Sequence, residues 1–229
     1  FQEIVRAHHR AEQFSAEICG VVKGSLVIGC YYSISAMWMP AILQKFCKRY
    51  PGITVSMREG GNSDMAKWLN EKSVDCCFGA KPSAENYDWI PLLQDELVAW
   101  LPADHPFAKK AAFPIQNLAK EPFIHTSPNH DTDQDRLLEA LHLHPQTRFS
   151  TRDGYTTYNM VEAGLGISFN QKLISKKWNG AVATVPFSPP QFVPLGITIP
   201  SLKEASPAAK KFIDCAIKAI QEISISDSD

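Results

Sequence analysis

Residues 24–57 read GSLVIGCYYSISAMWMPAILQKFCKRYPGITVSM, and they indicate a strand, a helix and a second strand in succession. Residues 26–30 form a short apolar run that leads into a polar segment, which is typical of a buried strand. An apolar face at helical spacing follows, made of Met39, Ile42, Leu43, Phe46, Cys47 and Tyr50. Pro51 and Gly52 then stop the helix, and residues 53–57 continue as a strand.

The same rhythm repeats immediately afterwards. Residues 59–63 (Glu-Gly-Gly-Asn-Ser) form a loop, a helix carries Met65, Trp68 and Leu69 on one side, and residues 74–78 read as a third strand. Strands that alternate with helices at this spacing indicate a parallel sheet covered by helices. Ligands of such sheets bind beyond the carboxyl ends of the strands, so we expect functional residues in those loops.

A second unit begins after Ala84, where the rhythm changes. We expect strands at residues 89–93, 96–101, 123–125, 147–151, 165–169 and 181–185, with helices at 134–141, before Gly164 and at 172–178. Residues 195–199 can carry the chain back by pairing with residues 96–101, and the amphipathic helix at 207–220 covers the first sheet. Two crossings between two units make a hinge.

Charge and cysteine usage limit the classes of function. The chain carries 23 Lys and Arg against 24 Asp and Glu, so it lacks the basic surface that binds a phosphate backbone. Its six cysteines form no CxxC pair and no metal-ligand spacing, which favours free thiols in a reducing cytoplasm and predicts no metal or cofactor. No apolar stretch approaches the length of a membrane span.

Several segments in this order carry a resemblance. They are residues 24–29 (GSLVIG), Met39-Pro40, residues 46–53 (FCKRYPGI), residues 59–63 (EGGNS) and residues 161–168 (VEAGLGIS). The chain resembles the effector-binding region of LysR-type transcription regulators over nearly its whole length. The resemblance implies an α/β fold of two Rossmann-like subdomains with a hinge, similar to type 2 periplasmic binding proteins.

The resemblance also implies the domain organisation and the partners. Residues 1–23 would be the end of a linker helix, residues 24–97 with 198–229 would form subdomain I, and residues 98–197 subdomain II. DNA would be bound only through a helix-turn-helix domain ahead of Phe1. We expect a cytoplasmic homodimer formed by subdomain I, because the helix at 35–50 leaves Met37 and Trp38 off its apolar face.

By the same resemblance, a small polar or anionic effector would bind in the cleft between the subdomains. Glycines let backbone approach a ligand, and helix N-termini offer unpaired N–H groups to it. The candidate contacts are Tyr32, Ser33, Ser35, Asn62 and Ser63 in subdomain I, and Thr126 and the 155–157 loop with Tyr155 and Thr156 in subdomain II. The serines and Asn62 could instead be helix caps alone, and Tyr31 and Tyr32 could serve packing, or one of their rings could form a wall of the cleft.

Two other functions remain open. An enzyme is disfavoured, because the chain has no GxSxG elbow, no HExxH and no phosphate-binding glycine loop. A solute-binding protein of a transport system would share the fold, but the cysteines favour a cytoplasmic regulator. One departure from the family is Phe169-Asn170, which stands where members often carry Leu-Pro.

Overall fold

The computed structural model describes residues 23–84, 86–176 and 178–226. The predicted linker segment at residues 1–23 therefore lies almost entirely outside the described residues. The elements, in chain order, are β1 (Gly24–Cys30), α2 (Tyr32–Met37), α3 (Met39–Arg49), β2 (Ile53–Glu59), α4 (Asn62–Asn70), β3 (Cys76–Ala80), β4 (Asp88–Pro102), β5 (Phe113–Pro114), η1 (Ile115–Lys120), β6 (Pro122–Thr126), α5 (Asp133–Ala140), β7 (Gln146–Thr151), α6 (Gly154–Glu162), β8 (Ser168–Gln171), α7 (Lys172–Ser175), β9 (Val182–Ile199) and α8 (Pro207–Ser226).

The chain divides into two compact units. Unit 1 ends at Leu93 and resumes at Pro194, and unit 2 is Gln94–Val193. Both boundaries fall four residues earlier than the sequence-based ones at 97/98 and 197/198. Two long strands, β4 and β9, each contribute residues to both units.

Unit 1 is built on a sheet whose first strands are parallel. β1 pairs in parallel with β2 on one side and with β3 on the other. β3 then pairs antiparallel with the last part of β9, Leu195 opposite Ala80. The sheet is therefore mixed, with the two predicted βα units at its parallel side, and the prediction of an α/β fold is confirmed.

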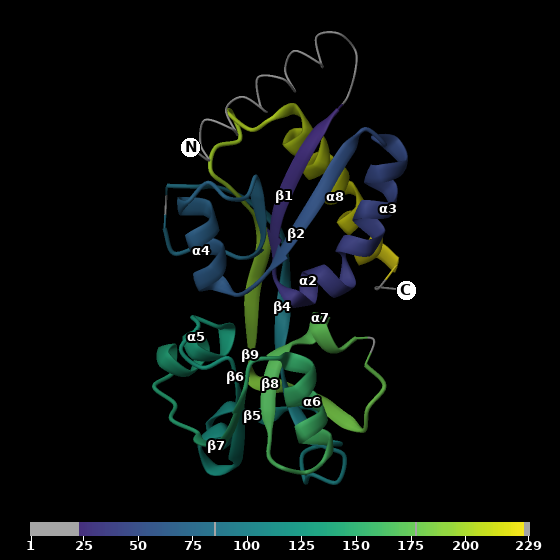
Figure 1. Cartoon of the computed structure of the whole chain (residues 1–229). Helices are drawn as coiled ribbons and strands as arrows, with labels where there is room; N and C mark the ends of the chain where they lie inside the picture. The colour runs from purple at the N-terminus through teal and green to yellow at the C-terminus, as the bar shows by residue number, and fades with distance from the viewer. Residues whose placement is uncertain (1–22, 85, 177, 227–229) are drawn as a thin grey trace. The chain divides into compact units, whose positions relative to one another are not determined.

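Helices cover both faces of the sheet of unit 1. Figure 1 shows α4 on one side of β1 and β2, and α3 with α8 on the other. Successive residues of β3 point to these opposite faces. A side chain added at Gly29, the β1 partner of Cys77, would meet Cys77 Sγ and the ring of Trp68 in α4, whereas Phe78 packs edge-on against Phe212 of α8.

The helix predicted to run through residues 35–50 is two helices. α2 ends at Met37, Trp38 lies between the two helices, and α3 starts at Met39. Pro40 explains the break, because proline has no N–H to donate to the carbonyl four residues earlier and its ring would clash there. Trp38 is only 2% exposed, so the expectation that it lies on an open face is wrong.

Unit 2 contains a two-stranded parallel sheet formed by β6 and β7. Ile167, just ahead of β8, bridges Phe123 of β6, while β8 itself pairs antiparallel with β4. The core of unit 2 contains two groups of packed aromatic rings. Trp100 contacts Tyr158 and Trp178, and a second group of rings is formed by Phe113, Phe123, Phe169 and Phe187.

Four strand predictions need correction. The segments 89–93 and 96–101 are one strand, β4, and the segments 181–185 and 195–199 belong to one strand, β9. Gly196 of β9 lies against the backbone oxygen of Ile90, earlier in β4 than the predicted 96–101 segment. β8 begins at Ser168 rather than Leu165, because Gly164 and Gly166 take φ values of +71° and +158° in the preceding turn.

Candidate functional site

The candidate residues of unit 1 gather where its parallel strands end. Cys30, the last residue of β1, is paired with Glu59 of β2 and with Phe78 of β3. Beyond these ends, the Tyr31 N–H donates to the Phe78 carbonyl at 3.0 Å, and the Gly60 N–H donates to the Cys30 carbonyl at 3.1 Å. Parallel pairing therefore places the start of α2 beside the start of α4, as the repeated βα pattern predicted.

Tyr31 and Asn62 link these two segments. The Tyr31 hydroxyl donates to the side-chain oxygen of Asn62, and both residues are buried. Gly79 of β3 leaves room for this arrangement. A side chain added at Gly79 would meet the Met65 sulfur at 2.9 Å and the Tyr31 ring at 3.0 Å. The sequence reasoning had assigned Tyr31 only to packing or to the wall of a cleft.

The candidate serines differ in their surroundings. Ser33 is 3% exposed, whereas Ser35 is half-buried and its hydroxyl donates to the Glu59 carboxylate. Tyr32 and Ser63 are exposed. The N-cap positions of α2 and α4 are held by Tyr31 and Gly61, so none of these candidates is the N-cap of either helix.

Glu59 brings negative charge to this edge of unit 1. Burial, and secondarily Glu59, raises the pKa of the Cys30 thiol to about 12, although a hydrogen bond with Ser35 lowers it. Cys30 is therefore a protonated, buried thiol at neutral pH. An anionic ligand at Ser35 would have to compete with the Glu59 carboxylate for the serine hydroxyl.

The candidate residues of unit 2 gather at a second pair of strand ends. Thr126, the last residue of β6, is paired with Thr151, the last residue of β7. The hydroxyl of Thr157, which is fully buried in α6, lies 2.8 Å from the Thr126 hydroxyl and 2.7 Å from the Thr151 hydroxyl. Three threonine hydroxyls from two strands and one helix thus form one cluster.

Tyr155 and Thr156 lie in the first turn of α6, not in a loop as predicted. The helix begins at Gly154 and is capped by Asp153, whose carboxylate accepts the Thr156 N–H at 2.7 Å and the Thr156 hydroxyl at 2.8 Å. Both Tyr155 and Thr156 are exposed, and the Tyr155 ring contacts Trp178. The carboxylate of Asp153 stabilises this helix terminus and already occupies its Thr156 N–H.

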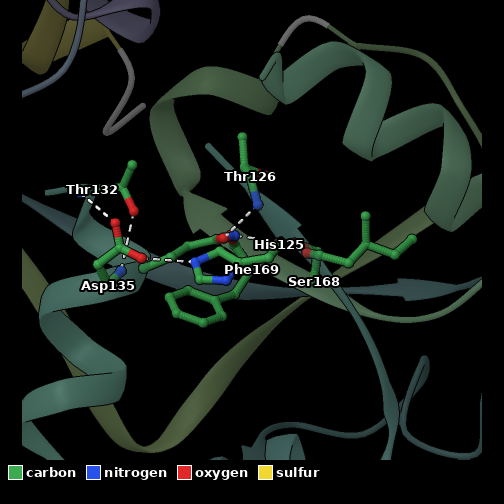
Figure 2. Close-up of polar contacts among 8 residues, drawn as sticks. His125, Thr126, Thr132, Asp135, Ser168 and Phe169 are labelled. Carbon is green, nitrogen blue, oxygen red and sulfur yellow. Dashed lines mark hydrogen bonds and ion pairs between the residues drawn. The ribbon is translucent and has the colours of Figure 1, made fainter. Parts of the chain in front are cut away.

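A buried amide fixes the end of β6. Gln134 of α5 is 4% exposed, and its side-chain oxygen accepts the Thr126 N–H at 2.8 Å. Its amino group donates to the Ser168 hydroxyl at 3.1 Å and to the Phe169 carbonyl, and Ser168 in turn donates to the Ile124 carbonyl at 2.8 Å. Figure 2 shows Thr126, Ser168 and Phe169 around this network, which ties β6 to β8.

An ion-pair contact lies next to it in unit 2. His125 Nε2 is 2.9 Å from Asp135 Oδ1, although the nitrogen lacks a well-aligned hydrogen bond (Figure 2). The other Asp135 oxygen accepts the Thr132 N–H at 3.0 Å, and the Thr132 hydroxyl accepts the Asp135 N–H at 3.1 Å. This reciprocal capping of α5 holds the carboxylate in place beside His125.

The sequence reasoning missed Thr151, Asp153 and Gln134. Asp153 did carry a signal, since an aspartate three residues before Thr156 at a helix start is a typical N-cap. Gln134 carried none, because two of its partners, Ser168 and Phe169, lie 34 and 35 positions away along the chain. Within the described residues, no group of His, Cys, Asp and Glu side chains could hold a metal ion, and no helix is long and apolar enough to cross a membrane.

Comparison with protein families gives one clear match. A family model described as the LysR substrate binding domain matches residues 20–221. The HTH-type transcriptional regulator YvbU of Bacillus subtilis (strain 168) is 29% identical over 220 residues, covering 94% of this chain and 74% of the relative. The regulator YnfL of Escherichia coli (strain K12) is 27% identical, covering 82% of this chain and 66% of the relative.

Solved structures show the same fold. The regulatory domain of CcmR from Synechocystis PCC6803 in complex with 2-PG is 20% identical, with a TM-score of 0.79 and coverage of 86% of this chain and 97% of that one. The effector binding domain of QuiR in complex with shikimate is 23% identical, with a TM-score of 0.75 and coverage of 87% and 98%. HinK, a LysR family regulator from Pseudomonas aeruginosa, is 24% identical, with a TM-score of 0.74 and coverage of 96% and 77%.

Proposed function

The chain belongs to the LysR substrate binding domain family, and on that premise we propose that it senses a small polar or anionic effector for a DNA-binding transcription regulator. The observation that carries this proposal is the family match across residues 20–221. Two neighbours of the same fold, QuiR and CcmR, were solved in complex with shikimate and with 2-PG, which are small molecules with acidic and polar groups. The transport alternative has no comparable support, since the relatives are transcription regulators.

We infer that the effector contacts both groups of strand-end residues. In unit 1 these are Tyr32, Ser33, Ser35, Asn62 and Ser63, and in unit 2 they are Thr126, Tyr155 and Thr156. Tyr32, Ser63, Tyr155 and Thr156 are exposed, so a ligand can reach them without a rearrangement of their own unit. Ser33 and Asn62 are 3% and 7% exposed, so each offers a ligand only a small part of its side chain.

The test is a thermal-shift screen of small carboxylates, phosphorylated acids and polyhydroxy acids with the whole chain. A ligand at about 100 times its dissociation constant adds about 2.7 kcal/mol of stability, which is readily detected. Absence of any shift with shikimate, benzoate and phosphorylated acids at millimolar concentration would count against effector sensing by this chain.

Matched variants then locate the ligand. We expect Asn62→Ala and Thr126→Val to weaken an identified ligand several-fold, because each removes a polar side chain at a strand end. Asn70→Ala is the control for unit 1, since Asn70 also accepts a tyrosine hydroxyl, from Tyr87, but lies at the other end of α4. Thr147→Val is the control for unit 2, since exposed Thr147 lies at the opposite end of β7 from Thr151.

The parent regulator would act in the cytoplasm as a homodimer and bind DNA through a separate domain. The near-neutral charge of the chain supports a separate DNA-binding part, and the free thiols Cys30, Cys47, Cys76, Cys77 and Cys215 support a reducing compartment. Because Trp38 is buried, dimerisation through subdomain I has to rest on other side chains. Light scattering at high micromolar concentration tests it, and a monomer there would contradict it. The chain is proposed to bind its effector without converting it, and turnover of a bound ligand would refute this.

A further inference from the structure

Unit 2 already provides a hydrogen-bond partner for the N–H and for the hydroxyl of Thr126. The Thr126 N–H donates a hydrogen bond to the side-chain oxygen of Gln134 at 2.8 Å. Its hydroxyl lies 2.8 Å from the hydroxyl of Thr157. The direction of the second bond decides what Thr126 can offer to a ligand, since a hydroxyl has one proton and two lone pairs.

The direction follows from a count of protons in the threonine cluster. Thr126, Thr151 and Thr157 contribute three hydroxyl protons. They are distributed over four short contacts: Thr126 with Thr157 at 2.8 Å, Thr151 with Thr157 at 2.7 Å, and the Asp153 carbonyl with Thr151 at 3.0 Å and with Thr157 at 3.2 Å. The Asp153 carbonyl also accepts the Thr157 N–H at 3.1 Å, which leaves it one lone pair for a hydroxyl.

If Thr126 donates to Thr157, three of the four contacts receive a proton. Thr157 can then donate to Thr151 while Thr151 donates to the Asp153 carbonyl, or Thr157 can donate to that carbonyl while accepting from Thr151. If Thr126 instead turns its proton outward, only two protons remain for the four contacts. One internal hydrogen bond is therefore lost when Thr126 turns outward, either at the fully buried Thr157 hydroxyl or at the Asp153 carbonyl.

We propose that Thr126 donates its hydroxyl proton inward to Thr157 and therefore accepts a hydrogen bond from the effector, so that it selects a hydroxyl or another donor rather than a carboxylate. The proposal rests on the proposed function, because it names the effector group that Thr126 recognises. A donor group on the ligand keeps the three internal bonds and adds a fourth. An acceptor group forces Thr126 to reverse, so one internal bond is lost for the one gained.

This difference of one hydrogen bond predicts a measurable selectivity. A ligand with a hydroxyl at the contact point should bind roughly three- to ten-fold more tightly than the same skeleton with a keto or methoxy group there. The effector class that fits is a hydroxylated small acid. A fully oxidised acid without a donor does not satisfy Thr126.

The first arm of the test needs no ligand. Nuclear magnetic resonance of the whole chain at low temperature should show the buried Thr157 hydroxyl proton with cross-peaks toward Thr151 or Asp153. Both inward arrangements place it on that side. Strong cross-peaks from this proton to the Thr126 methyl and β protons would mean that Thr157 donates to Thr126, and the proposal would be overturned.

The second arm uses matched ligand pairs as probes: shikimate with its keto counterpart, lactate with pyruvate, and para-hydroxybenzoate with para-methoxybenzoate. For a pair that binds, the hydroxylated member should be preferred by the chain and by Thr126→Ser, and the preference should collapse in Thr126→Val but persist in Thr147→Val. An equal or reversed preference in the unmodified chain overturns the proposal. If no member of any pair shifts the melting temperature, the proposed effector class fails, while cross-peaks from the Thr157 hydroxyl proton to Thr126 would still overturn the inward direction of the Thr126 bond.

Discussion

The hydroxyl of Tyr31 donates a hydrogen bond to the side-chain oxygen of Asn62 and so joins the end of β1 to the start of α4. A second tyrosine and asparagine, Tyr87 and Asn70, make the same contact at the other end of that helix. The two pairs differ in burial: Tyr31 and Asn62 are buried, whereas Asn70 is exposed. The two ends of α4 therefore allow the same tyrosine–asparagine hydrogen bond to be compared in a buried and in an exposed environment.

We expect Tyr31→Phe to lower the free energy of unfolding by about 1–2 kcal/mol, because it removes a donor inside the protein. Tyr87→Phe should cost about 0.5 kcal/mol or less, since water replaces the lost partner. Urea denaturation of both variants measures the difference. Equal losses would show that the buried pair contributes no more than the exposed one.

Gln134→Met should destabilise the chain more than either tyrosine variant. The substitution keeps the length of the side chain but removes its bonds to the Thr126 N–H, the Ser168 hydroxyl and the Phe169 carbonyl, all inside unit 2. We expect a loss of roughly 2–3 kcal/mol in urea denaturation. Gln146→Met, at an exposed position of β7, is the control and should stay within about 0.5 kcal/mol.

The first βα unit could be predicted because its pattern is local. The apolar run at residues 26–30 and the helical face through Phe46 depend on burial against one sheet, which periodicity reports directly. Pro40 also indicates the break at Trp38, although the sequence-based prediction ran a single helix through it. The continuity of β9 was hidden, because Pro186, Pro189, Pro190 and Pro194 are unfavourable in a strand interior and only the pairing with β3, β4 and β5 holds them there.

Some features of the candidate site could likewise be predicted from the sequence, and others could not. That Asn62 and Thr126 would stand at strand ends followed from the alternation of strands and helices, which needs no knowledge of partners. The roles of Gln134 and Thr157 could not be predicted, because each makes contacts with residues 31 or more positions away. Gln134 bonds to Ser168 and Phe169, and Thr157 bonds to Thr126. Their other contacts, of Gln134 with Thr126 and of Thr157 with Thr151 and Asp153, lie nearer in sequence. The hydrogen bond of Ser35 to Glu59 is likewise a product of the pairing of β1 with β2.

The cysteines should separate cleanly by reactivity. Burial raises the pKa of both Cys30 and Cys77 to about 12, and it raises that of Cys76 well above its usual value, so these thiols are protonated and shielded at neutral pH. Cys47 is exposed. Brief treatment with iodoacetamide at pH 7.5 (about one unit below a free thiol's pKa) should label Cys47 and spare the other three, as read by peptide mass spectrometry.

Labelling in denaturant is the control for this experiment and should reach all four thiols. Rapid native labelling of Cys30 or Cys77 would mean that β1 and β3 separate easily, contrary to their parallel pairing in the sheet.

The stability of the chain should carry a pH dependence that arises from Asp95. This carboxyl is 7% exposed, and burial raises its pKa from 3.8 to about 6, even though the Leu173 N–H, Lys176 and the Glu96 N–H favour the charged form. The folded state therefore holds a proton that the unfolded state has released between about pH 4 and pH 6. Stability contributed by the neutral carboxyl is complete below the lower value and is lost as the pH rises through the upper one. The loss is about 3 kcal/mol, at 1.36 kcal/mol for each pKa unit.

Asp95→Asn keeps an oxygen that can accept the Leu173 N–H, at 3.2 Å in the native chain, but has no charge to bury. Its free energy of unfolding relative to the native chain should therefore rise between pH 4 and pH 7, whereas exposed Asp104→Asn should show a constant difference. Urea titrations at several pH values measure both, and parallel curves for the native chain and Asp95→Asn would refute the raised pKa.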